Sequence, residues 1–347
     1  MQVWDRNTRC EAQIGERALK TLLLSAISLV ALATEALYGD VRLTGPELII
    51  EASMEPAEPA WSPDGSQITF VSRALDRGEI FVTDPDGSAS RNLTQHPARD
   101  QSPAWSTDGA HIAFVTNRNA ETEEETFSDI YVMDATGAGL QRLTPSPGRD
   151  YEPSWSSDGR IAFTTTPQGF TGPQIWVMNA DGTNRTGIVD YPDDVVGEPA
   201  HPVWSPSGAK IAYVFERDDR EDKFGESLWV VDPDGNNPTE LIWDHGGINA
   251  PRFSADGERI LYTTLRSGVM TLMVVDSDGQ NLCWVTTSLE RRITAGSWSP
   301  DGQRIVVSTR ALGDSELWIL FLDRVDTAVR GDSWGQLKHS ILFGWER

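Results

Sequence analysis

The sequence predicts an all-β protein, a six-bladed β-propeller of four-stranded antiparallel blades, and three observations lead to that fold class. A segment of the type Trp-Ser-Pro-Asp-Gly occurs six times, with its aromatic residue at positions 61, 105, 155, 204, 253 and 298. The copies are about 44 to 50 residues apart, a period typical of propellers. Each interval holds short β-type segments separated by tight turns, as in the blades of a propeller.

The second repeat shows how the local sequence specifies four strands. Residues 102–106 form an extended segment with a proline near its start, and a Thr-Asp-Gly turn follows. Residues 112–116 and 129–134 are rich in β-branched and aromatic side chains and are predicted to be the second and third strands. Residues 140–144 follow another glycine turn and form the predicted fourth strand. The other repeats have the same order of segments.

The sixth repeat lacks a fourth strand of its own, because the pattern ends after Leu322-Asp323. A replacement lies at the other end of the sequence, where Pro46-Glu47-Leu48-Ile49 resembles the fourth-strand segment Thr239-Glu240-Leu241-Ile242. We therefore expect the N-terminal strand to complete the last blade. Such closure removes the free sheet edges at which proteins aggregate.

The protein is predicted to have three parts: a signal peptide or short membrane anchor over residues 1–36, the propeller over 41–323, and a C-terminal tail over 324–347. Residues 22–33 are an apolar run preceded by basic residues and followed by small ones, which is the pattern of a secretory signal. The run is short for a membrane span. We expect an exported protein, periplasmic or extracellular. The alternatives are an uncleaved anchor and a helix of the domain itself.

The net charge restricts the partners. The sequence has 52 acidic residues and 29 Lys and Arg residues, for a net charge of -23. Nucleic-acid binding needs a basic surface and is not expected. A strongly acidic protein attracts basic partners and cations, although such charge also simply solvates a surface. We predict a protein or peptide partner, contact with a membrane only through the N-terminal segment, and a monomeric propeller.

The innermost strand of each blade is expected to line the channel at the centre of the ring. The residues three positions before each aromatic residue are Glu58, Ser102, Glu152, His201, Ala250 and Ala295. With polar neighbours in the same segments, the predicted ligand site consists of Glu58, Asp100, Ser102, Asp150, Glu152, His201, Asn249 and Arg252. Carboxylates and imidazole are ligands for divalent cations, so Glu58, Glu152 and His201 are the candidate metal ligands. A merely polar and hydrated channel mouth is the alternative, and no other cofactor is expected.

Motifs of common catalytic sites are missing from the sequence. It has no Gly-x-Ser-x-Gly nucleophile segment, no His-Glu-x-x-His zinc segment and no glycine-rich phosphate loop. The Asp-Gly turns are explained by turn chemistry and need no calcium. Charged runs such as residues 119–125 and 216–223 are expected to be solvated loops. No catalytic residue is therefore assigned.

The repeat resembles the WD-like propeller repeat of the TolB family, in which each blade carries Pro-x-Trp-Ser-Pro-Asp-Gly, an Ile-Ala-Phe strand, an Ile-Tyr-Val-Met-Asp strand and then Leu-Thr. The resemblance covers roughly residues 46 to 323 and is to the propeller of that family, without its N-terminal domain. It implies a non-catalytic exported scaffold. Such a scaffold would recognise a protein or peptide, with basic residues for instance, through the face with the longer loops and an acidic channel mouth.

Two other functions stay open at this point. Similar repeats occur in the propellers of prolyl-oligopeptidase-like peptidases, and some propeller lyases use histidine and carboxylates around the channel. A metal-assisted lyase or hydrolase with its site at the channel mouth is therefore the alternative. A structural envelope protein tethered by residues 22–33 is the third hypothesis.

Overall fold

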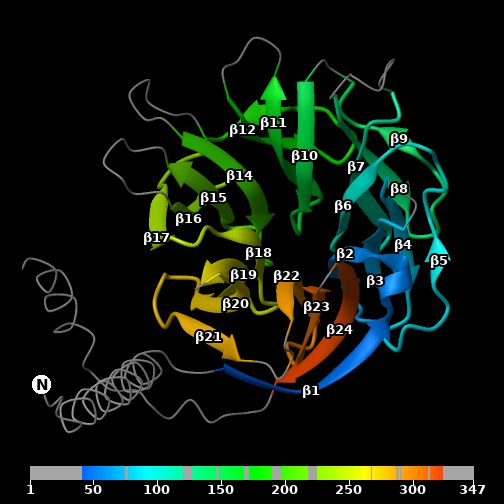
Figure 1. The fold of residues 1–347 in the computed structure, drawn as a ribbon. Coiled ribbons are helices and arrows are strands. Elements are labelled where there is room, and N and C mark those ends of the chain that lie inside the picture. Colours follow the sequence, from blue (N-terminus) through cyan, green and yellow to red (C-terminus); the bar gives the residue numbers. More distant parts are fainter. Residues whose placement is uncertain are drawn as a thin grey trace, which may run out of the picture.

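A computed structural model describes residues 41–322, except 75–76, 120–126, 146–147, 168–171, 190–196, 218–224, 267, 287–288, 290 and 312. The predicted signal or anchor segment and the C-terminal tail lie outside the described residues. Figure 1 shows the blades arranged in a ring, and the predicted six-bladed propeller is confirmed. No helix within the described ranges is long and apolar enough to cross a bilayer.

Blades 1 to 3 each have four antiparallel strands, numbered from the centre of the ring outwards. Blade 1 consists of β2 (Pro56–Trp61), β3 (Ile68–Ser72), β4 (Glu79–Thr83) and β5 (Arg91–Asn92). Blade 2 consists of β6 (Asp100–Trp105), β7 (His111–Thr116), β8 (Asp129–Asp134) and β9 (Gln141–Arg142). Blade 3 consists of β10 (Gly148–Trp155), β11 (Arg160–Pro167), β12 (Gln174–Asn179) and β13 (Thr186–Gly187).

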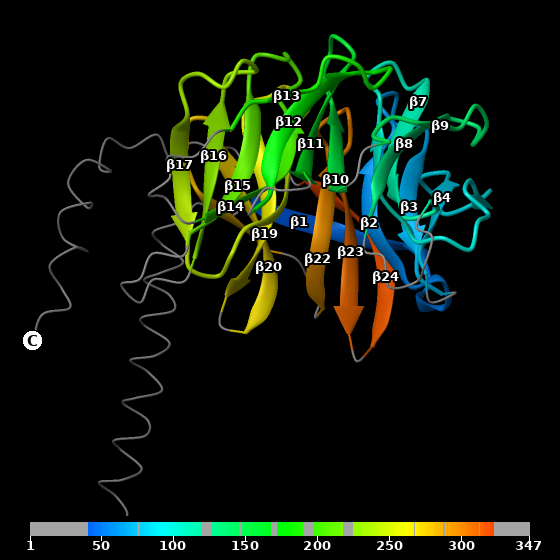
Figure 2. The same ribbon diagram turned by 90° about the horizontal axis from the view of Figure 1, so that it is seen from above.

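The remaining blades follow the same order. Blade 4 consists of β14 (Gly197–Trp204), β15 (Ile211–Arg217), β16 (Glu226–Val231) and β17 (Thr239–Asp244). Blade 5 consists of β18 (Asn249–Phe253), β19 (Arg259–Arg266), β20 (Val269–Asp276) and β21 (Cys283–Thr286). Blade 6 contributes β22 (Arg292–Trp298), β23 (Arg304–Ala311) and β24 (Asp314–Leu322). Figure 2, the same ribbon turned by 90°, shows β22, β23 and β24 of blade 6 side by side.

The strand β1 (Val41–Ile50) closes the ring, as predicted. It pairs antiparallel with β24, from Leu43 opposite Leu322 to Ile50 opposite Leu317. Its first residues also pair in parallel with β21, Val41 lying opposite Val285. Blades 5 and 6 are thereby joined into one eight-stranded sheet, visible at the bottom of Figure 1. A short 3-10 helix (Ala52–Met54) then leads into β2.

Neighbouring blades touch where the turn after a third strand meets the fourth strand of the preceding blade. A Cβ atom on Gly87 of blade 1 would lie only 2.0 Å from the carbonyl oxygen of Ile49 in β1. The same contact, at 2.5 to 2.9 Å, recurs between Gly137 and Leu93, Gly182 and Leu143, Gly235 and Ile188, and Gly279 and Leu241. Because Ile49 takes the place that fourth strands occupy elsewhere, β1 is structurally the fourth strand of blade 6.

The repeated tryptophan packs between blades. Trp61 of blade 1 is buried and belongs to the same core cluster as Val306 and Ile319 of blade 6. The guanidinium of Arg304, also from blade 6, lies 4.7 Å from the ring centroid of Trp61. Asp301 in the preceding turn holds Arg304 at 3.1 Å. The apolar ring and its cation together join two blades.

The serine and aspartate of the repeat build the turn itself. In blade 1 the Ser62 hydroxyl donates to Asp64 Oδ1 at 2.6 Å, and the N–H of Gln67 donates to Ser62 Oγ at 2.9 Å. The hydrogen bond from Ser62, with further ones from Ser66, lowers the pKa of Asp64 below its ordinary value. These bonds occupy the carboxylate with local donors, which is the turn chemistry expected from the sequence.

Replacing Gly87 by alanine should destabilise the ring at its closure. Gly159 has nearly the same positive φ, 83° against 81°, but a Cβ there would meet no atom within 4 Å. Backbone strain is therefore matched, and only Gly87→Ala pushes against the closing strand. We expect Gly87→Ala to lower the free energy of unfolding by about 1–3 kcal/mol more than Gly159→Ala, measured by chemical denaturation. Equal losses would show that β1 is not held at this contact.

Candidate functional site

The innermost strands of five blades share a bulge at an equivalent position. Five residues at the equivalent position have positive φ angles of 50–60°: Glu58, Ser102, Glu152, His201 and Ala250. Each lies within a register shift of the innermost strand pair. Non-glycine residues rarely adopt this conformation, and bulges redirect side chains. We call these five residues the channel mouth; Ala295, the sixth equivalent, has no positive φ.

Glu58 connects blade 1 to blade 2. Its Oε2 accepts a hydrogen bond from the backbone N–H of Ser102 at 2.7 Å. Its Oε1 forms an ion pair with Arg73 Nη2, also at 2.7 Å. The carboxylate thus satisfies the N–H of the bulge residue in the next blade. Its negative charge is largely compensated by Arg73.

Glu152 makes the corresponding connection from blade 3 to blade 4. Its Oε2 accepts from the His201 backbone N–H at 2.7 Å and from the Thr164 hydroxyl at 2.9 Å. Its Oε1 lies 2.8 Å from His201 Nδ1. Burial raises the pKa of Glu152, but the charge and hydrogen bonds of His201 outweigh it and leave the pKa lowered. Burial lowers the pKa of His201, and Glu152 outweighs it, so that this pKa is raised.

Arg252 places a second guanidinium near the channel mouth. Burial lowers its pKa, and the nearby carboxylates of Glu152 and Glu58 oppose that effect. Its Nη1 donates to the carbonyl of Pro251 at 2.8 Å. With Arg73 and His201, the described part of the channel mouth carries charges of both signs. The sequence suggested an acidic mouth because it did not show these pairings.

The other predicted site residues lie apart from this group. Asp100 is fully buried and pairs with Arg118 at 3.2 Å. Asp150 is also buried, and burial raises its pKa to about 6 although Thr165 and Thr144 donate hydrogen bonds to it. Asn249, at the start of β18, is half-buried and pairs with Thr263. The two aspartates are therefore buried and already have partners.

The three candidate metal ligands are not gathered into one cluster. Glu152 contacts His201, whereas Glu58 is held by Arg73 and Ser102. In the part of the protein that the structure describes, no three His, Cys, Asp or Glu side chains are grouped as metal ligands.

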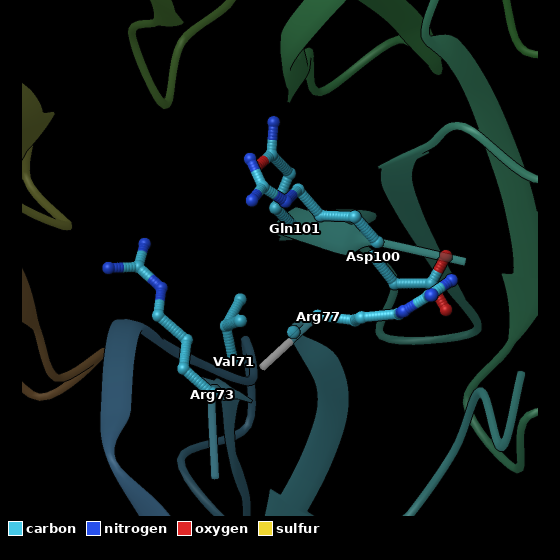
Figure 3. A pocket seen from close by; sticks show the side chains of 7 residues that line it. Val71, Arg73, Arg77, Asp100 and Gln101 are labelled. Carbon is cyan, nitrogen blue, oxygen red and sulfur yellow. The ribbon is translucent and has the colours of Figure 1, made fainter. Parts of the chain in front are cut away.

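A cavity beside the channel mouth was not predicted from the sequence. It has a volume of about 320 Å³ and lies between blades 1 and 2, lined by Val71, Arg73, Arg77, Gly78, Arg99, Asp100 and Gln101. Figure 3 shows Arg73 and Gln101 extending from different blades, with Arg77 alongside Asp100. The sequence carries one signal for this cavity, an arginine at or near the end of the second strand in five repeats, at positions 73, 118, 217, 266 and 310. Charged loops are ordinarily solvated, so this signal alone does not mark a site.

Comparison with known proteins agrees with this architecture. The family model described as the TolB beta propeller domain matches residues 208–330. The propeller is thus similar to that of TolB proteins. It is 30% identical to the Tol-Pal system protein TolB of Roseobacter denitrificans over 132 residues, which cover 38% of this sequence and 24% of that protein. The matched segments span only 10% to 33% of the curated relatives.

Solved structures show the same fold in proteins with different activities. A putative TolB from Agrobacterium tumefaciens superposes with a TM-score of 0.54 at 20% identity, covering 76% of this protein and 89% of that one. An oligogalacturonate lyase in complex with manganese superposes with a TM-score of 0.53 at 13% identity, covering 77% of each protein. The fold is thus shared by TolB proteins and an enzyme, and it does not decide between binding and catalysis.

The Glu152–His201 contact should make stability depend on pH. The raised pKa of His201 means that its contribution is complete below the ordinary histidine value and is lost as pH rises through the folded value. The lowered pKa of Glu152 means that its contribution is lost only as pH falls through that folded value. We expect His201→Gln to lower stability by roughly 1 kcal/mol, or about 2–4 °C, near pH 5.5, with a smaller effect above pH 8.

Thermal melting at several pH values measures this effect. His245→Gln is the matched control, because His245 is exposed and packs against Trp243. A loss for His201→Gln that is the same at every pH would contradict the ionic contribution of this contact.

Proposed function

We propose that this protein is a non-catalytic binding propeller, exported from the cytoplasm, that recognises a protein or peptide around the channel mouth. The observation that carries the proposal is the repeated bulge, which presents Glu58, Ser102, Glu152 and His201 from rigid inner strands. Binding groups held by strands and by supporting hydrogen bonds are preorganised for a ligand. Because the residue at the bulge position differs from blade to blade, each blade would make a different contact with the ligand.

The charges at the channel mouth support a polar partner segment. The ion pairs of Glu58 with Arg73 and of Glu152 with His201 offer groups of both signs to the polar side chains of a partner. The likeness to a Tol-Pal system protein supports a protein partner in general. The apolar run at residues 22–33, with its basic leader, supports export to the periplasm or beyond.

Selection of peptides on the immobilised propeller tests this proposal. We expect a display library to yield peptides whose binding slows hydrogen exchange in the inner strands around Ser102 and His201. The tight-turn face, which carries the turns after first and third strands, should keep its exchange rates. If no peptide is enriched, or if protection appears only on the tight-turn face, the proposed function is wrong.

The alternative of a metal-assisted lyase or hydrolase keeps one supporting contact, that of Glu152 with His201. A carboxylate that holds a histidine fixes the orientation of its ring, as around many metal sites. Under the binding proposal, Mn²⁺ and a chelator should leave the melting midpoint unchanged. A rise of several degrees with Mn²⁺ that disappears in His201→Gln would instead favour the metal site.

A further inference from the structure

The cavity between blades 1 and 2 has a local charge opposite to that of the whole protein. Its lining contains three arginines and a single acidic residue, Asp100, in a protein with a net charge of -23. Asp100 is fully buried and pairs with Arg118, and Glu58 pairs with Arg73. With these partners counted, two carboxylates face four guanidinium groups, those of Arg73, Arg77, Arg99 and Arg118. The cavity is therefore a site of positive charge on an acidic protein.

Two of the three lining arginines, Arg73 and Arg77, are held by neighbouring groups. The N–H of Asp100 in β6 donates to the carbonyl of Gly78 at 2.9 Å, which ties the loop before β4 to blade 2. On that loop, Arg77 Nη1 donates to the carbonyl of Pro97 at 2.9 Å. Arg73 is held by Glu58 of the channel mouth. A site fixed in this way loses little freedom when a ligand binds.

Two lining groups remain available to a ligand. Arg99 is exposed and its backbone N–H is held by Asn117 at 2.8 Å, but its guanidinium has no partner among the described residues. Gln101 is half-buried, and its side-chain amide likewise has no hydrogen-bond partner in the described ranges. A guanidinium matches the planar, two-oxygen geometry of a carboxylate. A side-chain amide beside it can bond to the N–H and C=O groups of a peptide.

We propose that this cavity binds a carboxylate of an acidic peptide segment, from an Asp or Glu side chain or from a free C-terminus. The inference rests on the proposed function as a peptide-binding propeller and assigns a partner chemistry to it. Arg73 belongs both to the cavity and to the Glu58 ion pair, so the cavity continues the channel mouth. A peptide is favoured over an acidic sugar because the described lining contains no aromatic ring for a sugar to pack on.

Titration calorimetry at low salt tests the proposal with three ten-residue peptides blocked at both ends and rich in Glu, Gln or Lys. We expect the Glu peptide to bind more tightly than the Gln peptide, although the net charge repels it. Arg99→Gln should weaken the Glu peptide roughly three- to tenfold. Arg259→Gln removes the same charge at the tight-turn face and should leave the affinity unchanged. Both variants should melt like the parent protein.

Further probes identify the source of the carboxylate. A neutral peptide with a free C-terminus that competes with the Glu peptide assigns the site to a terminal carboxylate. Absence of such competition assigns it to acidic side chains. An oligogalacturonate that binds more tightly than either peptide would make the occupant an acidic sugar and overturn the peptide assignment.

Equal affinity for the Glu and Gln peptides, or equal weakening by Arg99→Gln and Arg259→Gln, would overturn the inference. The proposed function would survive either result if other peptides still protected the channel mouth in hydrogen exchange. The proposed function itself would fail if no peptide slowed hydrogen exchange in the inner strands at the channel mouth.

Discussion

The structure depends on close backbone contact between each blade and the blade before it. The turn after a third strand lies so near the preceding fourth strand that a single added carbon would overlap a carbonyl oxygen. Two of the buried tryptophans, Trp61 and Trp204, also pack between blades, each beneath an arginine of the preceding blade. Because these contacts recur from boundary to boundary, the angle between blades is set locally. The ring is built by repeating a similar contact between neighbouring blades, as in other repeat proteins.

The same construction explains why the channel-mouth carboxylates are joined to neighbouring blades. A bulge frees a backbone N–H on the inner strand, and a buried N–H without a partner is costly. Glu58 and Glu152 supply that partner from the previous blade. Their recurring geometry is thus a matter of stability first, and the ligand meets side chains that are already held in place. Binding and folding use the same residues here.

The fold was largely predictable from the sequence, because each repeat carries its own turn signals and its own β-type segments. Closure by residues 46–49 was predictable too, since that segment resembles a fourth strand. The bulge position was found correctly, but not its partners: Glu58 and Ser102 are 44 residues apart, and their contact depends on the angle between blades. Arg73 and Arg99 come from different blades, so their proximity was unpredictable for the same reason. Asp100 was expected in the channel, although it lies two residues before the bulge and is buried.

The closing strand gives the propeller a particular weak point. Every other fourth strand is joined to its own blade by a short turn, whereas β1 reaches β24 from the opposite end of the sequence. A molecule that releases β1 exposes the edge of β24, and a released β1 fits that edge in any other copy equally well. Exchange of β1 between molecules would give dimers in which every blade is intact. The pairing of β1 with β24 that completes the monomer is thus also the place where two molecules can exchange strands.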